Sequence, residues 1–482
     1  MQYSSTRNKH ITVTSLEAIL EGLASDGGLY LPERVPHFDL EVLKELDFEA
    51  LMIEILYAYF DDFSKSEIKD MVEKAYASKF DTPDFTPLSS CGKLYVLELY
   101  HGPTAAFKDV ALTILPYLMA KAKEKLGHHE TTHILTATSG DTGSAALAGF
   151  EDVPGFTITV FYPSKGISEI QKRQMTACEG KNAFVYGLKG NFDDAQRAVK
   201  DLFSRSKEFD LALSSANSIN IGRLVPQVTY YFKAYFDLVH AKRIKLGDEV
   251  SFSVPSGNFG NILAATLAKL GGLPIRHLIC ASNDNRVLTD FIQTGIYDIR
   301  RPFYTTSSPS MDILVSSNLE RLLALWSSRD DQLINDLMDQ LKTLGHYALP
   351  KPLHDQIQSL FIGEFVTQDQ VDETIKTQYE NSRYLLDPHS AIGVKAALSH
   401  LGDEPMIVCA TASPFKFPST ILKALGHPVS QDEFEDLERL KALSPQACPA
   451  LLKHLHERPI RHPLTVDKEA LFALVKAKEH HD

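Results

Sequence analysis

From about residue 93 onward, the chain repeats one order of elements: an apolar strand, a short loop and a helix. The strand patterns are the apolar runs KLYVLEL, HILTAT, TITVFYP, NAFVYGL, VSFSVPSG and RHLICAS, and a helical pattern follows each of them. Strands joined by helical crossovers run parallel, and helices cover both faces of such a sheet. The repeat therefore predicts an α/β fold, to which the run MIVCATASP (406–414) returns as a late strand.

The regions before and after this repeat have a different pattern. The first ninety or so residues carry apolar residues at helical spacing, as in FEALMIEILYAYF and KSEIKDMVEKAYASKF. We predict a small, mostly helical N-terminal domain at 1–90, with FDTPDFTPL (80–88) as its linker. The α/β region then covers 91–427 as two subdomains with a helical insertion at about 310–400, and a charged helical tail covers 428–482.

Composition excludes several classes of function. The 49 basic and 62 acidic residues give a net charge of −13, so we expect neither nucleic acid nor an anionic membrane as partner. No apolar run approaches the roughly 18 residues of a membrane span, and the polar start MQYSSTRNKH does not resemble a signal peptide. The five cysteines are scattered and form no CxxC, which predicts a reducing cytoplasm, no disulfide framework and no metal site.

The stretch HGPTAAFKDVALTILPYL (101–118) places one lysine, Lys108, where a loop becomes an apolar helix. A lysine on a solvated face does not need to lie at such a junction. Lys108 could simply lay its stem on apolar surface while its ammonium reaches water. The alternative is a buried amine with a chemical role, and the other loops must decide between the two.

Two loops between a strand and a helix are candidates for binding anions. In PSGNFGN (255–261), Gly257 and Gly260 allow close backbone approach, and N–H groups at a helix start attract a phosphate. Alternatively, the two glycines could serve only to form a tight turn between the strand and the helix. ATSGDTGSAAL (137–147) repeats this arrangement, although its serine and aspartate could also serve only as helix caps.

Two further loops add an arginine and hydroxyl groups. SSANSINIGR (214–223) ends in Arg223, which could bind a phosphate with its bidentate fork or form an ordinary salt bridge. CATASPFKFP (409–418) places Thr411 and Ser413 after a strand, where a hydroxyl can bind a buried ring nitrogen or its own backbone. Ligands bind at the carboxyl ends of parallel strands. Together these loops offer what pyridoxal phosphate requires: an amine, a phosphate cradle and a partner for its ring nitrogen.

The motifs, taken in order, resemble the bacterial and fungal branch of the threonine synthase family. The resemblance spans residues 3 to about 418 and rests on YSSTRN, SDGGLYLP, LELYHGPTAAFKD, TSGDTG, NSINIGR, PSGNFGN, SPSMDI, LDPHSAIG and ATASPFKF. It implies a fold-type II pyridoxal-phosphate enzyme of the tryptophan synthase β-like superfamily. It also implies a lyase that converts O-phospho-L-homoserine and water to L-threonine and phosphate, in the last step of threonine biosynthesis.

The resemblance assigns roles to residues of this sequence. Lys108 would be the catalytic lysine that carries the cofactor and moves the substrate protons. The residues that would hold the cofactor are Lys108, Asp141, Gly257, Asn258, Phe259, Gly260, Asn261 and Thr411. The residues that would bind the substrate are Thr138, Ser139, Thr142, Ser218 and Arg223. Asp141 stands where many relatives have asparagine near the cofactor's phenolic oxygen, and an aspartate there would repel a phenolate unless a proton is shared.

Three alternatives remain open at this stage. A serine or threonine dehydratase would share the cofactor but would not need Arg223 for a phosphate. A paralogue without catalysis would bind phospho-ligands or partner proteins. A nucleotide-binding protein is disfavoured because no G-K-[ST] follows the glycine loop. For the enzyme we expect a small-molecule substrate and a monomer or a small homo-oligomer.

Overall fold

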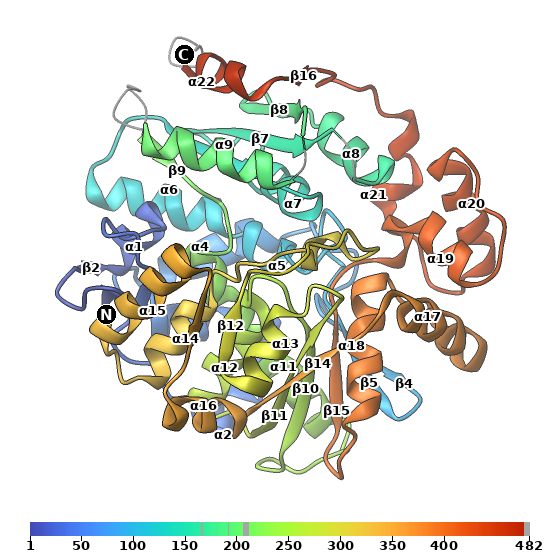
Figure 1. Cartoon of the computed structure of the whole chain (residues 1–482), viewed down its shortest axis with the longest axis horizontal. Helices are drawn as coiled ribbons and strands as arrows, with labels where there is room; N and C mark the ends of the chain where they lie inside the picture. Colours follow the sequence, from blue (N-terminus) through green and yellow to red (C-terminus); the bar gives the residue numbers. More distant parts are fainter. Residues whose placement is uncertain (165–166, 191, 206–211, 477–482) are drawn as a thin grey trace.

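The computed structural model describes residues 1–164, 167–190, 192–205 and 212–476. Two mainly parallel sheets lie in separate halves of the molecule (Figure 1). The larger sheet has the strand order β14-β11-β10-β15-β5-β4, and only the pair β4–β5 is antiparallel. The smaller sheet has the order β16-β8-β7-β6-β9 and is parallel throughout. The strands of the larger sheet are β4 (Leu88–Cys91), β5 (Leu94–Glu98), β10 (Val250–Pro255), β11 (Ile275–Ser282), β14 (Phe361–Phe365) and β15 (Met406–Ala410). Those of the smaller sheet are β6 (Thr132–Ala137), β7 (Phe156–Pro163), β8 (Ala183–Leu188), β9 (Ala212–Ser214) and β16 (Thr465–Val466).

Helices cover both sheets, as the strand–loop–helix pattern predicts. The helices of the strand–loop–helix region are α5 (Asp109–Leu112), α6 (Leu115–Leu126), α7 (Asp141–Phe150), α8 (Glu169–Thr176), α9 (Phe192–Ser204), α10 (Ile221–Leu224), α11 (Val228–His240), α12 (Gly260–Leu270) and α13 (Val287–Thr294). Helices α12, α13 and α18 (Pro388–Ser399) pack on the larger sheet, whereas α7 and α9 pack on the smaller one. None of the helices in the described part of the chain is long and apolar enough to cross a membrane.

The N-terminal segment combines helices with a small sheet that helical spacing did not predict. Its helices are α1 (Ser15–Glu21), α2 (Leu40–Leu43), α3 (Phe48–Tyr59) and α4 (Lys65–Tyr76). Its strands, paired antiparallel in the order β2-β1-β3, are β1 (Gln2–Ser5), β2 (Thr12–Thr14) and β3 (Tyr30–Pro32). Capping boxes start two of the helices, Thr14 with Glu17 at α1 and Ser64 with Glu67 at α4. The apolar faces of these helices join the same core as Leu97 and Val110 of the larger half.

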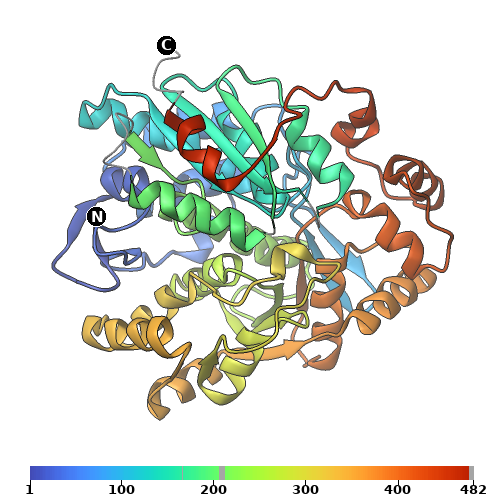
Figure 2. The same cartoon turned by 45° about the horizontal axis from the view of Figure 1, so that its top comes forward.

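The segment 310–400 is mainly helical but contains two strands, and the tail combines helices with one short strand. The helices of the segment are α14 (Leu319–Trp326), α15 (Asp331–Leu344), α16 (Lys351–Gln358), α17 (Gln368–Ser382) and α18. Those of the tail are α20 (Glu433–Leu443), α21 (Ala450–Lys453) and α22 (Leu471–Lys476), and α19 (Pro418–Ala424) lies between the two regions. Strand β14 extends the larger sheet, and β13 (His346–Ala348) pairs with β12 (Ile296–Asp298). In the tail, β16 adds to β8, and α22 packs beside the smaller sheet (Figure 2). Strands β13 and β16 have only three and two residues, too few to show an alternating pattern.

The topology brings the chemically interesting loops to one place. Lys108, the glycine loop 256–261 and Thr411 follow the carboxyl ends of β5, β10 and β15, which are neighbours in the larger sheet. The loop 138–143 follows β6, and the loop 215–223 follows its neighbour β9 in the smaller sheet. The candidate site therefore lies at the carboxyl ends of strands from both sheets.

Candidate active site

The loop that carries Lys108 joins β5 to α5 and is held by a buried carboxylate. Asp109 accepts hydrogen bonds from the backbone N–H of Thr104 at 2.8 Å and from its hydroxyl at 2.5 Å. The N–H of Phe107 donates to the carbonyl of Thr411 at 2.8 Å. Lys108 is thus fixed beside the segment that follows β15, as the sheet order requires.

The Lys108 side chain is buried among charged and polar groups. Its Nζ lies 3.4 Å from the hydroxyl of Ser310. Burial lowers the pKa of the Lys108 ammonium to about 8. The carboxylate of Asp141 opposes this shift, whereas the cations Arg223 and Lys416 add to it. The amine is therefore easier to deprotonate than that of a solvated lysine.

The loop between β6 and α7 turns tightly around one threonine. The Oγ1 of Thr138 accepts two backbone N–H groups of this loop, each at 2.9 Å. Gly140 has a φ of 140°, and a Cβ there would lie 2.6 Å from the Gln171 side chain, so only glycine fits. Thr138 is buried, whereas Ser139 and Thr142 are half-buried. Thr138 therefore shapes the loop, and the other two hydroxyl residues keep accessible surface.

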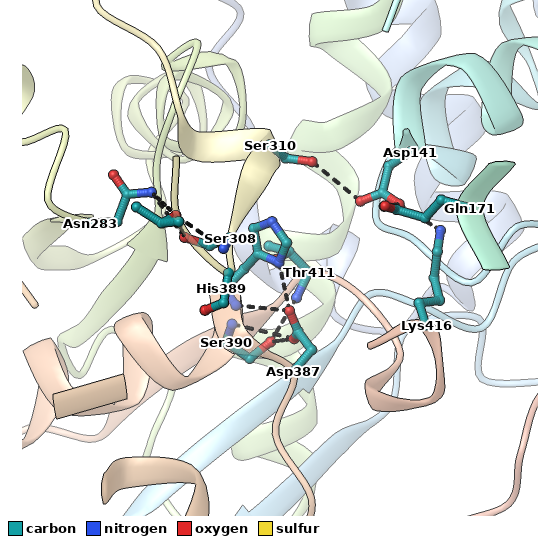
Figure 3. Close-up of polar contacts among 12 residues, drawn as sticks. Asp141, Gln171, Asn283, Ser308, Ser310, Asp387, His389, Ser390, Thr411 and Lys416 are labelled. Carbon is teal, nitrogen blue, oxygen red and sulfur yellow. Dashed lines mark hydrogen bonds and ion pairs between the residues drawn. The ribbon is translucent and has the colours of Figure 1, made fainter. Parts of the chain in front are cut away.

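Asp141, which begins α7, is paired with a buried lysine (Figure 3). The Nζ of Lys416 lies 2.6 Å from the Asp141 carboxylate and donates to the Thr104 carbonyl at 2.9 Å. The Gln171 amide donates to the same carboxylate at 2.9 Å. Burial raises the pKa of Asp141, but the charges of Lys416 and Lys108 outweigh burial and hold the pKa far below its usual value. Asp141 is therefore an ionised carboxylate with its own counterion.

Lys416 was not predicted as a site residue, although it lies within the motif ATASPFKF. It stands between two phenylalanines and its side chain is fully buried. This apolar setting is the same signal that singled out Lys108. The counterion also answers the question that the sequence raised about Asp141, since a paired carboxylate repels a neighbouring anion far less than a bare one.

We expect Lys416→Met to destabilise the fold, because the change leaves Asp141 buried without its counterion. Removing one partner of a buried ion pair costs about 3–5 kcal/mol. Adding Asp141→Asn should recover most of that loss, since the amide carries no charge. Urea unfolding of both variants measures the effect. A Lys416→Met protein as stable as the wild type would contradict the importance of the pair.

The glycine loop 256–261 leads into α12, whose first N–H groups have no acceptors within the helix. Phe259 has a φ of 62°, a left-handed conformation that costs energy for a residue other than glycine. A Cβ at Gly257 would lie 2.8 Å from the Ser310 carbonyl, so the segment before Met311 lies against this loop. Together these features present backbone N–H groups at a helix N-terminus, an arrangement that favours a phosphate.

The loop 214–223 is joined to the glycine loop and carries a buried arginine. The Asn318 side-chain amide donates to the carbonyls of Ser218 and Asn258, each at 3.1 Å. Arg223 donates to the Ala216 carbonyl at 2.9 Å, and burial lowers its pKa to about 10. Among the described residues, no acidic side chain forms an ion pair with Arg223. The guanidinium is therefore a buried cation that lacks a counterion.

Several buried polar atoms in and around these loops have no hydrogen-bond partner. Within the described part of the chain they include Arg223 Nε, Asn261 Nδ2, His389 Nε2 and Ser413 Oγ. An unpaired buried polar group costs about 1–3 kcal/mol, so such a group of atoms indicates a polar ligand. With the buried amine and the helix N-terminus, the set fits a ligand that carries an aldehyde, a phosphate and ring heteroatoms, as pyridoxal phosphate does.

The motif LDPHSAIG, which contributes to the family resemblance, places three further residues at the site that were not predicted: Asp387, His389 and Ser390. Asp387 caps α18 and accepts the Nδ1–H of His389 at 2.8 Å. The hydroxyl of Ser390 accepts the N–H of Thr411 at 3.2 Å. The structure thus places this motif beside the end of β15 (Figure 3). The signal in the sequence was an aspartate and a histidine two positions apart at the start of an apolar helix.

The fold and these loops define a class that comparison with known proteins confirms. The model "Pyridoxal-phosphate dependent enzyme" matches residues 80–411, and the chain is a fold-type II enzyme of this class. The models "Threonine synthase N terminus" and "Threonine synthase, C-terminal" match residues 2–76 and 390–470. The chain belongs to the threonine synthase family.

Individual relatives agree with this placement. Threonine synthase-like 1 of Macaca fascicularis is 41% identical, over 85% of this chain and 58% of that protein, so the chain spans little more than half of that relative's length. Threonine synthase of Saccharomyces cerevisiae is 37% identical, over 92% of this chain and 93% of that protein. The crystal structure of PLP-bound threonine synthase from Brucella melitensis has a TM-score of 0.89 and 37% identity, and covers 100% of this chain and 99% of that one.

Proposed function

We propose that this protein catalyses the threonine synthase reaction, in which O-phospho-L-homoserine and water give L-threonine and phosphate. One observation supports this function most strongly. Arg223 is a buried cation without an acidic partner among the described residues, and it lies close enough to Lys108 to lower the pKa of that amine. A net acidic chain needs such a local cation to bind a dianionic substrate. A dehydratase that acts on an unphosphorylated amino acid does not need it.

The cofactor would be held mainly by residues that follow strands of the larger sheet. Lys108 would bind it covalently, the loop Gly257–Asn261 would bind its phosphate, and Thr411 would face its ring nitrogen. Asp141, neutralised by Lys416, would lie near its phenolic oxygen. When bound, pyridoxal phosphate withdraws electrons from the bonds at the substrate Cα. A neutral hydroxyl at Thr411 leaves the ring nitrogen unprotonated, which favours elimination and replacement over transamination.

The substrate would lie between the two sheets. The hydroxyls of Ser139 and Thr142 and the N–H groups of their loop, which Thr138 shapes, would bind the α-carboxylate. Ser218 and Arg223 would bind the phosphate and neutralise its charge as it leaves Cγ. Lys108 would take the proton from Cα and pass it to the cofactor, and would then take one from Cβ and return it to Cγ.

We expect the attachment of added pyridoxal phosphate to Lys108 to speed up with pH until about 8 and then to level off. Only the unprotonated amine attacks an aldehyde, and burial lowers the pKa of Lys108 to about 8. Below this value the fraction of free amine rises about tenfold per pH unit. The absorbance at about 410 nm, followed in the cofactor-free protein, measures the rate. A rate that still rises at pH 10, as for a solvated lysine, would contradict this environment.

A comparison of substrates tests the proposed function. Purified protein with pyridoxal phosphate is incubated with O-phosphohomoserine, L-serine or L-threonine, and amino acids, phosphate and oxo acids are measured. We expect threonine and phosphate in equal amounts from the first substrate and little 2-oxo acid from the others. Rapid formation of 2-oxo acid from serine or threonine, without turnover of phosphohomoserine, would instead show a dehydratase.

We also propose a cytoplasmic location and a monomer or small homo-oligomer. The location is supported by the cysteines, all five of which are free. Cell fractionation and analytical ultracentrifugation test these two points.

A further inference from the structure

The buried pair Asp387–His389 lies beside the site and has no part in the roles assigned so far. Asp387 is 1% exposed and His389 is 3% exposed. The carboxylate accepts the backbone N–H of His389 at 2.9 Å and its ring Nδ1–H at 2.8 Å. It also accepts the Ser390 hydroxyl, so its position at the start of α18 is firmly held.

The carboxylate fixes the tautomer of the ring. The Asp387 carboxylate accepts backbone N–H groups as the cap of α18, so a singly protonated His389 ring directs its N–H at Nδ1 toward Asp387 and leaves the lone pair on Nε2. Nε2 is buried and has no hydrogen-bond partner in the described part of the chain. A buried nitrogen with a free lone pair can accept a proton from a molecule that enters the site.

The unpartnered nitrogen is directed into the site. In Figure 3 the ring stands between Ser308 and Thr411, with one nitrogen toward Asp387 and its other edge toward Ser310. Ser310 in turn contacts Lys108 and Asp141. A positive charge on His389 would lower the pKa of two buried carboxylates, Asp141 and Asp312, so the ring lies near both.

We propose that His389 is the base that takes the proton from the water added to the substrate, an inference that rests on the proposed function. After phosphate has left and Cγ has been protonated, the substrate carbons carry a double bond between Cα and Cβ. The water oxygen forms a bond to Cβ, its proton passes to Nε2 of His389, and the electron pair of the double bond moves to Cα. A proton from the Lys108 ammonium then binds Cα, which completes the addition of H and OH.

Two separate groups suit this step better than one. Addition across the double bond needs a base at the water and an acid at Cα. One lysine could serve both steps only if its Nζ reached the water at Cβ as well as Cα. His389 supplies a second group at the water, and Asp387 stabilises the imidazolium that forms, as a carboxylate does beside other catalytic histidines.

The test compares His389→Asn with the wild type by product analysis. An asparagine amide can keep the hydrogen bond to Asp387 but provides no base. We expect phosphate release within about threefold of wild type, because steps before water addition are intact. Loss of a general base slows water addition by about 100-fold or more. The stalled enamine leaves and hydrolyses to 2-oxobutanoate and ammonia, so the ratio of threonine to 2-oxobutanoate should fall at least tenfold.

Two further variants sharpen the test. In Asp387→Asn the amide donates to Nδ1 and moves the ring proton to Nε2, so this variant should show the same change in product ratio. His400→Asn is the matched control, because His400 pairs with Glu364 at 2.7 Å outside these loops and its loss should leave the ratio unchanged. Absorbance of the bound cofactor and the unfolding midpoint identify any variant that has lost its structure.

A spectroscopic measurement is independent of turnover. Nitrogen-15 NMR of the cofactor-free protein, labelled at histidine and assigned by comparison with His389→Asn, should show a protonated Nδ1 and a bare Nε2. A neutral ring with its proton on Nε2 would overturn the proposal. An unchanged product ratio in His389→Asn, beside a wild type that forms threonine, would also overturn it. A wild type that forms no threonine would contradict the proposed function as well.

Discussion

Lys108→Ala is expected to lose turnover, with a fall in kcat of at least about 10,000-fold. The proposed mechanism uses this amine both to attach the cofactor and to move protons at three substrate carbons. Loss of one buried side chain at the start of α5 should leave the fold intact, since Asp109 holds the loop through Thr104. Steady-state kinetics and the absorbance at about 410 nm, which borohydride removes, measure both roles.

The matched control for this change is another buried lysine. Lys233→Ala removes a lysine of α11 that pairs with Asp237 at 2.7 Å and lies outside the loops of the site. It should keep the absorbance and most of the activity. A Lys108→Ala protein that retains the borohydride-sensitive absorbance would show that another lysine carries the cofactor.

Arg223→Ala should lower kcat/KM for O-phosphohomoserine by about 30-fold to several thousand-fold, or about 2–5 kcal/mol. The expected loss is large because Arg223 is buried and, among the described residues, has no acidic partner of its own. The side reaction with L-serine should change little, since serine carries no phosphate. Kinetics with both substrates separate the two effects.

Arg223→Lys serves as the conservative variant. Lysine keeps the charge but loses the bidentate fork, so its kcat/KM should lie between the wild type and Arg223→Ala. If Arg223 only supports the Ala216 carbonyl, to which it donates at 2.9 Å, both substrates should suffer equally. Small and equal losses would therefore reject Arg223 as the phosphate ligand.

The sequence predicted most of the α/β fold, because its strands and helices follow from local patterns of apolar residues. Apolar runs followed by helical spacing located β5, β6, β7, β8, β10 and β11 and the helices after them. The late run at 406–414 was correctly placed as a returning strand, and it inserts between β10 and β5. Once the sheet is parallel, its loops meet at the carboxyl ends of the strands. Lys108 and Thr411 were therefore expected at the same edge of the sheet, and the structure places their strands β5 and β15 side by side.

What local pattern did not predict depends on packing between distant segments. The pair of Asp141 and Lys416 joins residues from separate halves of the chain, and neither local sequence contains its partner. The orientation of His389 follows from the cap at Asp387 and from the position of α18 against β15. Strand β16 has two residues, and β14 lies at the sheet edge between the helices α16 and α17, so the spacing of apolar residues did not show either strand. Such features depend on tertiary structure, which spacing along a single chain does not describe.

Isotope tracing in water enriched in oxygen-18 tests the central claim most directly. The protein with pyridoxal phosphate is incubated with O-phosphohomoserine, and mass spectrometry locates the label in the products. We expect one labelled oxygen in the β-hydroxyl of threonine and none in phosphate, because the bond between Cγ and oxygen breaks and water adds at Cβ. Homoserine with labelled phosphate would show simple phosphate hydrolysis and would contradict the proposed function.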